Sequence, residues 1–190
     1  MPVVTIFAGP NGSGKSSIID SVAFVGRDNL LEADAIAKRI HVTPPLSAAI
    51  AAGREVLRRT QEYLDSGENF AIETTLSGKW TLTAVREARL QRFFMRLVYI
   101  CLGSPEQCIR RVRERVAQGG HDVPNDDVRR RYFRSLANAK QLLTIMDEAF
   151  VYDNSGPEPK LIFELRAGRL SSKSSYIPEW ARGLLEGTAL

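Results

Sequence analysis

The residues GPNGSGKS at positions 9–16 follow the pattern G-x-x-x-x-G-K-S/T, with a lysine and a hydroxyl directly after the last glycine. Glycines at this spacing let backbone N–H groups wrap around phosphate oxygens, and the positive end of a following helix attracts the same charge. The lysine supplies a cation for the terminal phosphates, and the hydroxyl supplies a ligand for Mg²⁺. The stretch therefore predicts a binding site for a nucleoside triphosphate.

The sequence around this stretch has the setting that such a loop requires. Val3–Ala8 is a short apolar run that predicts a strand, and Ser16–Val25 has the pattern of a helix. We expect Lys15 to bridge the β- and γ-phosphates of ATP and Ser16 to ligate Mg²⁺. The residues expected to bind ATP here are Gly9, Asn11, Gly12, Ser13, Gly14, Lys15, Ser16 and Ser17.

Strand-like and helix-like segments alternate along the rest of the chain. This order predicts a three-layer α/β/α fold, in which helices cover both faces of a parallel sheet. At 190 residues the chain is expected to form a single domain, residues 1–190. The further expected strands are Leu30–Glu32, Phe70–Ile72, Leu97–Leu102, Val151–Asp153 and Leu161–Leu165. The further expected helices are Ala48–Asp65, Thr81–Phe93, Pro105–Gln118 and Asp126–Phe150.

The C-terminal part carries a weaker pattern. The serine-rich stretch SSKSS at 171–175 is typical of a flexible connection. We expect the tail over residues 171–190 to be peripheral, with a helix that packs on the body of the domain.

The composition is that of an ordinary globular protein, with 44% hydrophobic and 25% charged residues and a net charge of +4. The two cysteines, Cys101 and Cys108, are expected to be reduced and buried, and no Cys/His cluster has zinc-ligand spacing. The N-terminus lacks the features of a signal peptide, and no apolar run approaches the ~18 residues that span a bilayer. The sequence thus predicts a cytoplasmic protein without a membrane segment.

An acidic residue, Asp34, comes shortly after the expected strand Leu30–Glu32. Ligands of open α/β sheets bind at the carboxyl ends of the strands, so this carboxylate falls where substrates are expected. Phosphoryl transfer to a hydroxyl commonly uses a carboxylate that accepts the proton, and Asp34 is a candidate for this base. An equally good alternative is that Asp34 caps the helical turn Ala35–Ile40.

Polar residues also follow the next strands. Glu73 comes after the apolar run Phe70–Ile72, where a carboxylate would orient a Mg²⁺ water or contact the acceptor; the alternative is a backbone tie. Thr75, with Thr74 and Ser77 beside it, could hydrogen-bond a polar acceptor or cap the following helix. Asn154 would lie beside the adenine or form a turn.

Eight arginines and five acidic residues lie between positions 105 and 134, which gives this segment a net charge of +3. The pairs Glu106/Arg110, Arg110/Glu114 and Asp127/Arg131 have the spacing of ion pairs on a helix surface. No aromatic residues alternate with the arginines, as they would in a protein that stacks single-stranded bases. Nucleic acid is therefore not the expected partner of this segment.

The same segment has the pattern of an arginine-bearing helical lid. Gly119 and Gly120 separate two expected helices, and arginines lie on both sides of this hinge. A lid over residues 115–131 could close on the triphosphate and place guanidinium groups on its oxygens. Arg115 and Arg131 are the candidates, with Arg130 close behind Arg131.

Taken together, the chain resembles the zeta-toxin family of P-loop kinases, and most of all its compact, stand-alone branch. The resemblance extends from Val3 to Gly156. It rests on GPNGSGKSS, LEADAIAKRI, AIETTLSGK, VYDNSG and the long stretch LVYICLGSPEQCIRRVRERVAQGGHDVPNDDVRRRYFRS, in which GGHDVP with its trailing arginines is the most specific part.

This resemblance implies an adenylate-kinase-like core that uses ATP and Mg²⁺. The catalytic aspartate of the family matches Asp34, its substrate-contacting glutamate and threonine match Glu73 and Thr75, and a lid arginine matches Arg115. The second lid arginine of the larger toxins falls near His121, so that Arg131 or Arg130 would take its role. Toxins of this family phosphorylate UDP-N-acetylglucosamine on a sugar hydroxyl, and a small antitoxin protein can block the nucleotide site.

The sequence therefore predicts an ATP-dependent kinase that acts on a small hydroxylated metabolite. Two alternatives stay open at this point. One is a polynucleotide kinase or an ATP-dependent nucleic-acid-binding protein. The other is a slow ATPase whose main role is to bind a partner, as a toxin-like subunit does.

Overall fold

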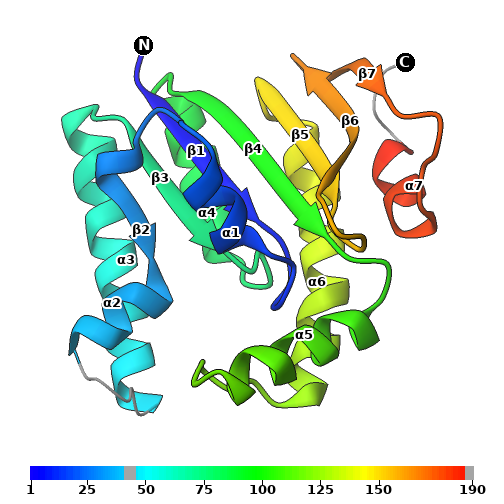
Figure 1. Ribbon diagram of the computed structural model, residues 1–190. Helices are drawn as coiled ribbons and strands as arrows, with labels where there is room; N and C mark the ends of the chain where they lie inside the picture. The colour runs from blue at the N-terminus through cyan, green and yellow to red at the C-terminus, as the bar shows by residue number, and fades with distance from the viewer. Residues whose placement is uncertain (41–45, 187–190) are drawn as a thin grey trace.

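A computed structural model describes residues 1–40 and 46–186 of the chain, and its centre is one seven-stranded sheet. The strand order is β2-β3-β1-β4-β5-β6-β7 (Figure 1). The first five of these strands run parallel, whereas β6 and β7 are antiparallel to their neighbours. The strands are β1 (Val3–Ala8), β2 (Leu30–Glu32), β3 (Phe70–Thr74), β4 (Phe94–Cys101), β5 (Glu148–Asp153), β6 (Lys160–Arg166) and β7 (Arg169–Lys173).

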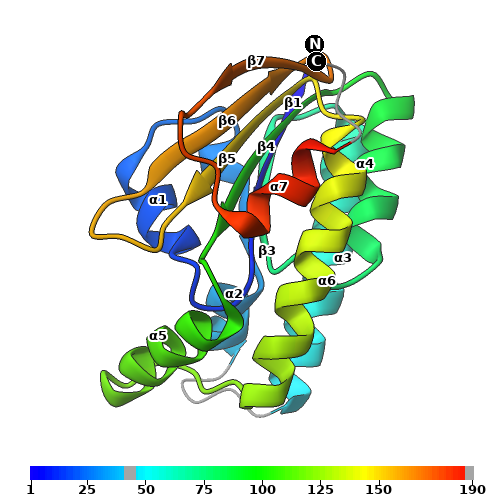
Figure 2. The same cartoon turned by 90° about the vertical axis from the view of Figure 1, so that its right-hand side faces the viewer.

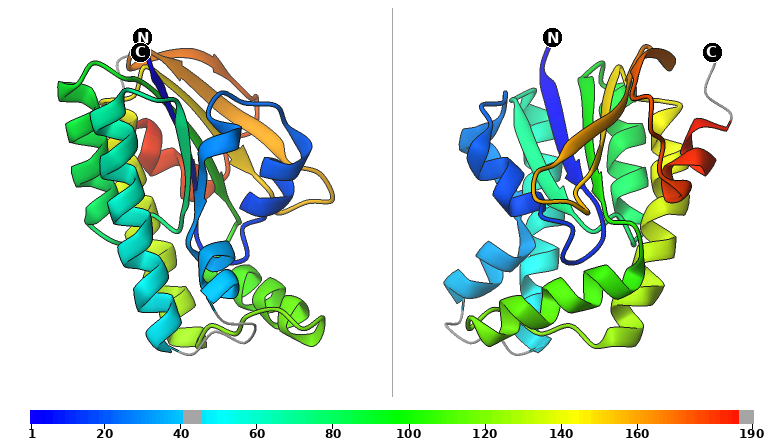
Figure 3. Two further views of the ribbon diagram at one scale, coloured as in Figure 1. Left: turned by 90° about the vertical axis from the view of Figure 1, so that its left-hand side faces the viewer. Right: turned by 45° about the vertical axis from the view of Figure 1, so that its right-hand side comes forward.

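Helices cover both faces of the sheet, as the alternation of elements predicts. In Figure 2 and in the left view of Figure 3, α1 lies against one face and α3, α4 and α6 lie against the other. The arm made by α5 and the start of α6 lies below the carboxyl ends of the parallel strands. The helices are α1 (Lys15–Ser21), α2 (Ala33–Ile40), α3 (Leu46–Ser66), α4 (Trp80–Leu90), α5 (Pro105–Ala117), α6 (Asn125–Leu143), α7 (Glu179–Leu185) and the 3₁₀ turn η1 (Arg27–Asn29).

Alternation of side chains along β1 builds a core on each face of the sheet. Val4 and Ile6 belong to the larger core under α3, α4 and α6, whereas Phe7 packs with Ile18 and Ile19 of α1. This arrangement fixes the end of β1, and thus the start of the following loop, between two packed layers. Across the described residues, no helix combines the length and apolar character that a membrane crossing needs.

The predicted order of strands and helices up to β6 is confirmed, but several details and element bounds differ. The sheet is mixed rather than purely parallel, because β6 and β7 turn back as hairpins. The prediction of a flexible connection at 171–175 is wrong for residues 171–173, which pair with β6 as part of β7. The expected C-terminal helix is α7, and residues 187–190 of the predicted tail lie outside the described part.

The predicted helix Asp126–Phe150 is wrong beyond Leu143, where α6 ends. Asp147 explains the break, because its carboxylate accepts from the backbone N–H of Met95 at 2.8 Å and pairs with Arg89 at 3.1 Å. The backbone carbonyl of Asp147 also accepts from the N–H of Ala167. These contacts draw the chain into the sheet, and β5 begins at the next residue.

The prediction for the cysteines is confirmed, because Cys101 and Cys108 are both buried and unpaired with each other. Burial raises the pKa of the Cys108 thiol to about 12 and that of Cys101 well above its usual range. Both side chains therefore remain protonated and act as small apolar groups in the core.

Candidate active site

The loop between β1 and α1 needs glycine at several positions because neighbouring elements press against its backbone. A Cβ atom on Gly9 would lie 1.9 Å from the carbonyl oxygen of Ile100 in β4. A Cβ atom on Gly14 would lie 2.2 Å from Nδ2 of Asn154, and the φ of Gly14 is +92°, in the left-handed region. Only glycine fits at these two positions, which lets the loop backbone curve tightly, as a phosphate cradle requires.

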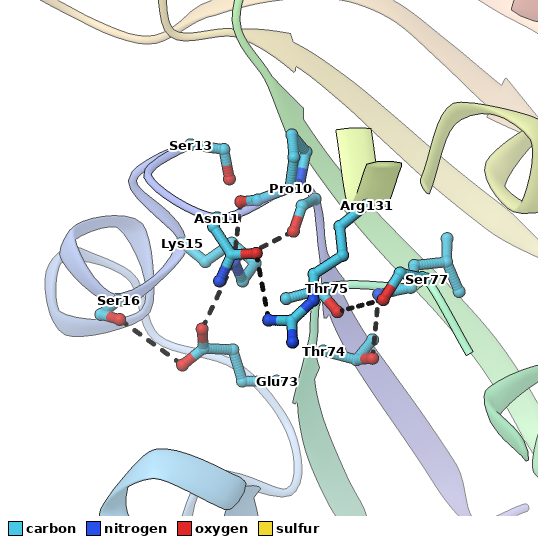
Figure 4. Close-up of polar contacts among 12 residues, drawn as sticks. Pro10, Asn11, Ser13, Lys15, Ser16, Glu73, Thr74, Thr75, Ser77 and Arg131 are labelled. Atoms are coloured by element: carbon cyan, nitrogen blue, oxygen red, sulfur yellow. Dashed lines mark hydrogen bonds and ion pairs between the residues drawn. The ribbon is translucent and has the colours of Figure 1, made fainter. Parts of the chain in front are cut away.

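Lys15 and Ser16 at the start of α1 converge on one carboxylate, that of Glu73 at the end of β3 (Figure 4). The buried amine of Lys15 lies 3.6 Å from Oε1 of Glu73 and donates to the carbonyls of Gly9 at 3.0 Å and Pro10 at 3.2 Å. The Ser16 hydroxyl donates to Oε2 of Glu73 at 3.5 Å. The loop lysine, the loop hydroxyl and the predicted strand-end carboxylate thus form one cluster.

Asn154, after β5, supports this loop from the other side. It is 8% exposed, and its Nδ2 donates to the carbonyl of Ser13 at 2.8 Å. The backbone carbonyl of Asn154 accepts from Nη2 of Arg111 in α5 at 2.7 Å. Asn154 is therefore a tie to the loop backbone, and its predicted contact with adenine remains a prediction.

The acidic residues at the end of β2 form a second group beside Glu73. Asp34 is exposed in the first turn of α2, which begins at Ala33, so Asp34 lies inside the helix rather than at its cap. Glu32 pairs in register with Glu73 on the neighbouring strand. The pKa of Glu32 is raised from 4.5 to about 7, and burial is the largest cause. The hydrogen bond with Glu73 and the negative charge of Glu73 also raise it, and the charges of Asp20 and Asp34 add to this effect.

The two predicted lid arginines occupy different positions. Nη1 of Arg131 lies 3.4 Å from Oδ1 of Asn11 in the loop (Figure 4). Nη2 of Arg131 lies 3.7 Å from the carboxylate of Asp127. Arg115 instead donates to the carbonyl of His121 at 2.7 Å and packs against Gly120, where a Cβ would lie 2.5 Å from Arg115 Cγ. The structure brings Arg131 to the loop, while Arg115 holds the turn between α5 and α6.

The ion pairs around the lid agree in part with the predicted spacing. Arg110 pairs with Glu114 at 4.0 Å and Arg131 with Asp127, as expected. Glu106 does not pair with Arg110 but with Arg129 of α6 at 3.3 Å, which joins the two helices of the arm. Arg130 also pairs with Asp127, at 2.7 Å, so acids neutralise much of this basic segment.

The predicted acceptor-contacting residue Thr75 lies in the loop between β3 and α4. Its hydroxyl is 2.9 Å from the hydroxyl of Ser77, and both lie on the side of the loop where Arg131 approaches (Figure 4). Glu73, Thr75 and Arg131 thus surround one region at the carboxyl ends of β1 and β3. Ser17, one residue further along α1 than Ser16, is exposed.

Two residues beside the loop were not predicted. Glu32 is the last residue of a three-residue strand, and only the register of β2 on β3 brings it to Glu73. Arg111 lies on the same face of α5 as Cys108 and Val112, which also contact Gly12. This spacing of three and four residues was the signal that could have identified Arg111.

Known proteins resemble this chain in sequence and in fold. A family model described as an AAA domain matches residues 4–151. The chain belongs to this family. An uncharacterized protein of Haemophilus influenzae is 32% identical over 130 residues, which cover 66% of this chain and 89% of that protein.

Solved structures with a similar fold include chains of two complexes. A chain of the AvrRxo1-ORF1:ORF2 complex with ATP superposes with a TM-score of 0.69 at 13% identity over 100% of this chain, which spans 64% of that chain's length. A chain of the PezAT toxin–antitoxin system of Streptococcus pneumoniae superposes with a TM-score of 0.64 at 16% identity, over 86% of this chain and 72% of that chain. This AAA-domain protein therefore shares its P-loop fold with the chains of these two complexes.

The residues of the loop fit ATP and Mg²⁺. The buried hydroxyl of Ser13 in this loop has no hydrogen-bond partner among the described residues, so it can donate to a phosphate oxygen. Ser16 and Glu73 provide the hard oxygen atoms that Mg²⁺ prefers, and Lys15 provides a cation for phosphate.

The left-handed Gly14 gives the first testable prediction. Gly14→Ala should weaken ATP binding by at least about tenfold, because the new Cβ displaces Asn154 and distorts the phosphate cradle. Gly53→Ala in α3 is the matched control, since nothing lies within 4 Å of a Cβ there. This control should bind ATP as the wild type does and be more stable by about 0.5–1 kcal/mol. Calorimetric titration with ATP measures the difference, and equal affinities would contradict it.

Glu32 gives a prediction about stability and pH. The unfolded chain releases the Glu32 proton near pH 4.5, whereas the folded chain releases it near pH 7. Within this window the folded state binds more protons, so stability falls as the pH rises and is level above it. Glu32→Gln should match the wild type at pH 4, below both pKa values, and exceed its stability at pH 8 by on the order of 1 kcal/mol, because water screens the half-exposed site. Urea unfolding in metal-free buffer measures this, and parallel pH profiles would exclude the shift.

Proposed function

We propose that the protein is an ATP-dependent phosphotransferase that moves the γ-phosphate of ATP to a hydroxyl group of a small metabolite. The observation that carries the proposal is the convergence of Lys15 and Ser16 on Glu73, with the guanidinium of Arg131 on the opposite side. Phosphoryl transfer depends on positioning and on neutralisation of charge, and these side chains provide both.

Each residue has a distinct task in this proposal. Lys15 and Arg131 neutralise the charge of the phosphate oxygens, while Ser16 and Glu73 hold the metal ion. Mg²⁺ bound to ATP supplies additional positive charge at the transferred phosphate. Asp34 accepts the proton of the attacking hydroxyl, and its exposed position in the first turn of α2 leaves the carboxylate accessible to an acceptor. Arg115 reaches the phosphate oxygens only after the turn that it holds between α5 and α6 has rearranged.

A UDP-amino sugar is the first acceptor to test, because the resemblance to zeta toxins implies a sugar-nucleotide substrate. Thr75 and Glu73 are the residues proposed to contact it. The fold similarity to chains of the AvrRxo1-ORF1:ORF2 and PezAT complexes supports a protein partner of the antitoxin kind. Nucleic acid is a weaker candidate, because acids on α5 and α6 pair with the arginines of the arm.

The proposed role of Asp34 predicts a separation of binding from chemistry. Asp34→Asn should lower the rate of phosphoryl transfer by about 10²–10⁴-fold, because the amide cannot accept the acceptor proton. The dissociation constant for ATP should stay within about twofold of the wild type, since a twofold change is less than about 0.5 kcal/mol. Loss of ATP binding together with turnover would contradict the role of a base.

Phosphorus NMR of ATP with the purified protein and UDP-N-acetylglucosamine measures this transfer directly. Lys15→Ala serves as the control that lacks the loop cation. A new phosphomonoester signal that requires both the sugar nucleotide and Lys15 would support the proposal. ADP and inorganic phosphate alone would point to hydrolysis or to another acceptor, and binding of oligonucleotides that weakens steeply with salt would favour the nucleic-acid alternative.

A further inference from the structure

One helix, α6, contacts both the phosphate-binding loop and the loop after β3. Near its start Arg131 reaches Asn11, as described above. Seven residues further, two turns along the same face, Nδ2 of Asn138 donates to the carbonyl of Leu76 at 2.8 Å and lies 3.5 Å from that of Gly78. The helix therefore links the site of the nucleotide with the loop that carries Thr75 and Ser77.

Between these two contacts, α6 is fastened to the sheet. The hydroxyl of Tyr132 donates to the carbonyl of Leu102 at 2.8 Å, and the hydroxyl of Ser135 is 3.1 Å from that of Tyr99 in β4. All three side chains, Tyr99, Tyr132 and Ser135, are buried. Two buried hydrogen bonds thus hold this part of α6 in place between Arg131 and Asn138.

The loop after β3 adopts a backbone conformation that needs support. Leu76 has a φ of +54°, a left-handed value that is uncommon for a residue with a branched side chain. Its side chain is fully buried, and its N–H donates to the hydroxyl of Thr74 at 3.0 Å. The donation from Asn138 to its carbonyl completes the support, and this conformation sets the hydroxyls of Thr75 and Ser77 side by side.

We infer that Asn138 is a positioning residue for the phosphate acceptor. Its amide fixes the loop so that Thr75 and Ser77 present a pair of hydroxyls at a set distance from Arg131 and the phosphate-binding loop. Ser77 is then a second acceptor-binding hydroxyl beside Thr75. This inference rests on the proposed function and deepens it, because it assigns the acceptor to a preformed pair of hydrogen-bonding groups rather than to a surface shaped by the acceptor itself.

Two variants remove the support, and one serves as a control. Asn138→Ala deletes the amide, and Asn138→Asp replaces its donor by a carboxylate that faces two carbonyl oxygens. Gln141→Ala removes an exposed amide from the same helix. Trypsin cleavage after the exposed Lys79, which follows the loop, reports the order of the backbone without any need for an acceptor.

Cleavage after Lys79 should become at least about fivefold faster in both Asn138 variants and stay unchanged in Gln141→Ala, since freeing the loop raises its local opening. The dissociation constant for ATP should remain within about twofold in all three variants. With UDP-N-acetylglucosamine as the acceptor probe, the KM for the acceptor should rise about tenfold, a loss of about 1.4 kcal/mol, with the KM for ATP unchanged. Unchanged cleavage, or a parallel loss of ATP affinity, would overturn the positioning role.

Ser77→Ala keeps the test valid if the Asn138 variants fail to fold. This variant should raise the KM for the acceptor without a change in cleavage after Lys79. It removes one hydroxyl and leaves the hydrogen bond from Asn138 to the carbonyl of Leu76 in place. An unchanged KM for the acceptor would exclude Ser77 from binding. A wild-type protein that binds ATP but transfers phosphate to no acceptor would contradict the proposed function, whereas unchanged cleavage in an active enzyme would contradict only the role of Asn138.

Discussion

The ion pair between Lys15 and Glu73 is the interaction on which the rest of the site depends. The parallel register of β1 and β3 places Phe7 opposite Glu73, so the end of β3 lies directly beside the phosphate-binding loop. The same carboxylate accepts from Ser16. A single acidic group therefore holds the amine of Lys15 and the hydroxyl of Ser16 in one place. Under the proposed function, preorganisation of this kind lowers the cost of reorganising the site during phosphoryl transfer.

The rest of the architecture keeps this cluster in position. The end of β4, the start of α5 and Asn154 press on the loop so closely that only glycine fits at several of its positions. On the opposite side, a hydrogen bond between the hydroxyls of Ser135 and Tyr99 joins α6 to β4. The same helix carries Arg131 and Asn138 two turns apart on one face. The candidate site thus lies in a corner between the sheet and α6, and Arg115 holds the turn between α5 and α6 through the carbonyl of His121.

Local patterns predicted the elements and the residues that lie within a motif or directly after a strand. The loop at 9–16, Glu73 and Thr75 belong to this class, and they lie together in the structure. Glu32 and Asn138 could not be predicted, because their roles depend on strand register or on packing between segments far apart in the sequence. The strand β7 was missed for the same reason, since its serine-rich sequence pairs with β6 only once the hairpin has formed.

The most direct test of the account is the effect of Mg²⁺ on ATP binding to the wild type and to Glu73→Gln. Calorimetric titration with ATP, with and without Mg²⁺, measures it, and Glu68→Gln at an exposed carboxylate before β3 is the control. The account predicts that Mg²⁺ strengthens ATP binding at least about tenfold in the wild type and the control, a gain of about 1.4 kcal/mol, and that most of this gain is lost in Glu73→Gln. An equal gain in all three proteins would contradict the central role of Glu73.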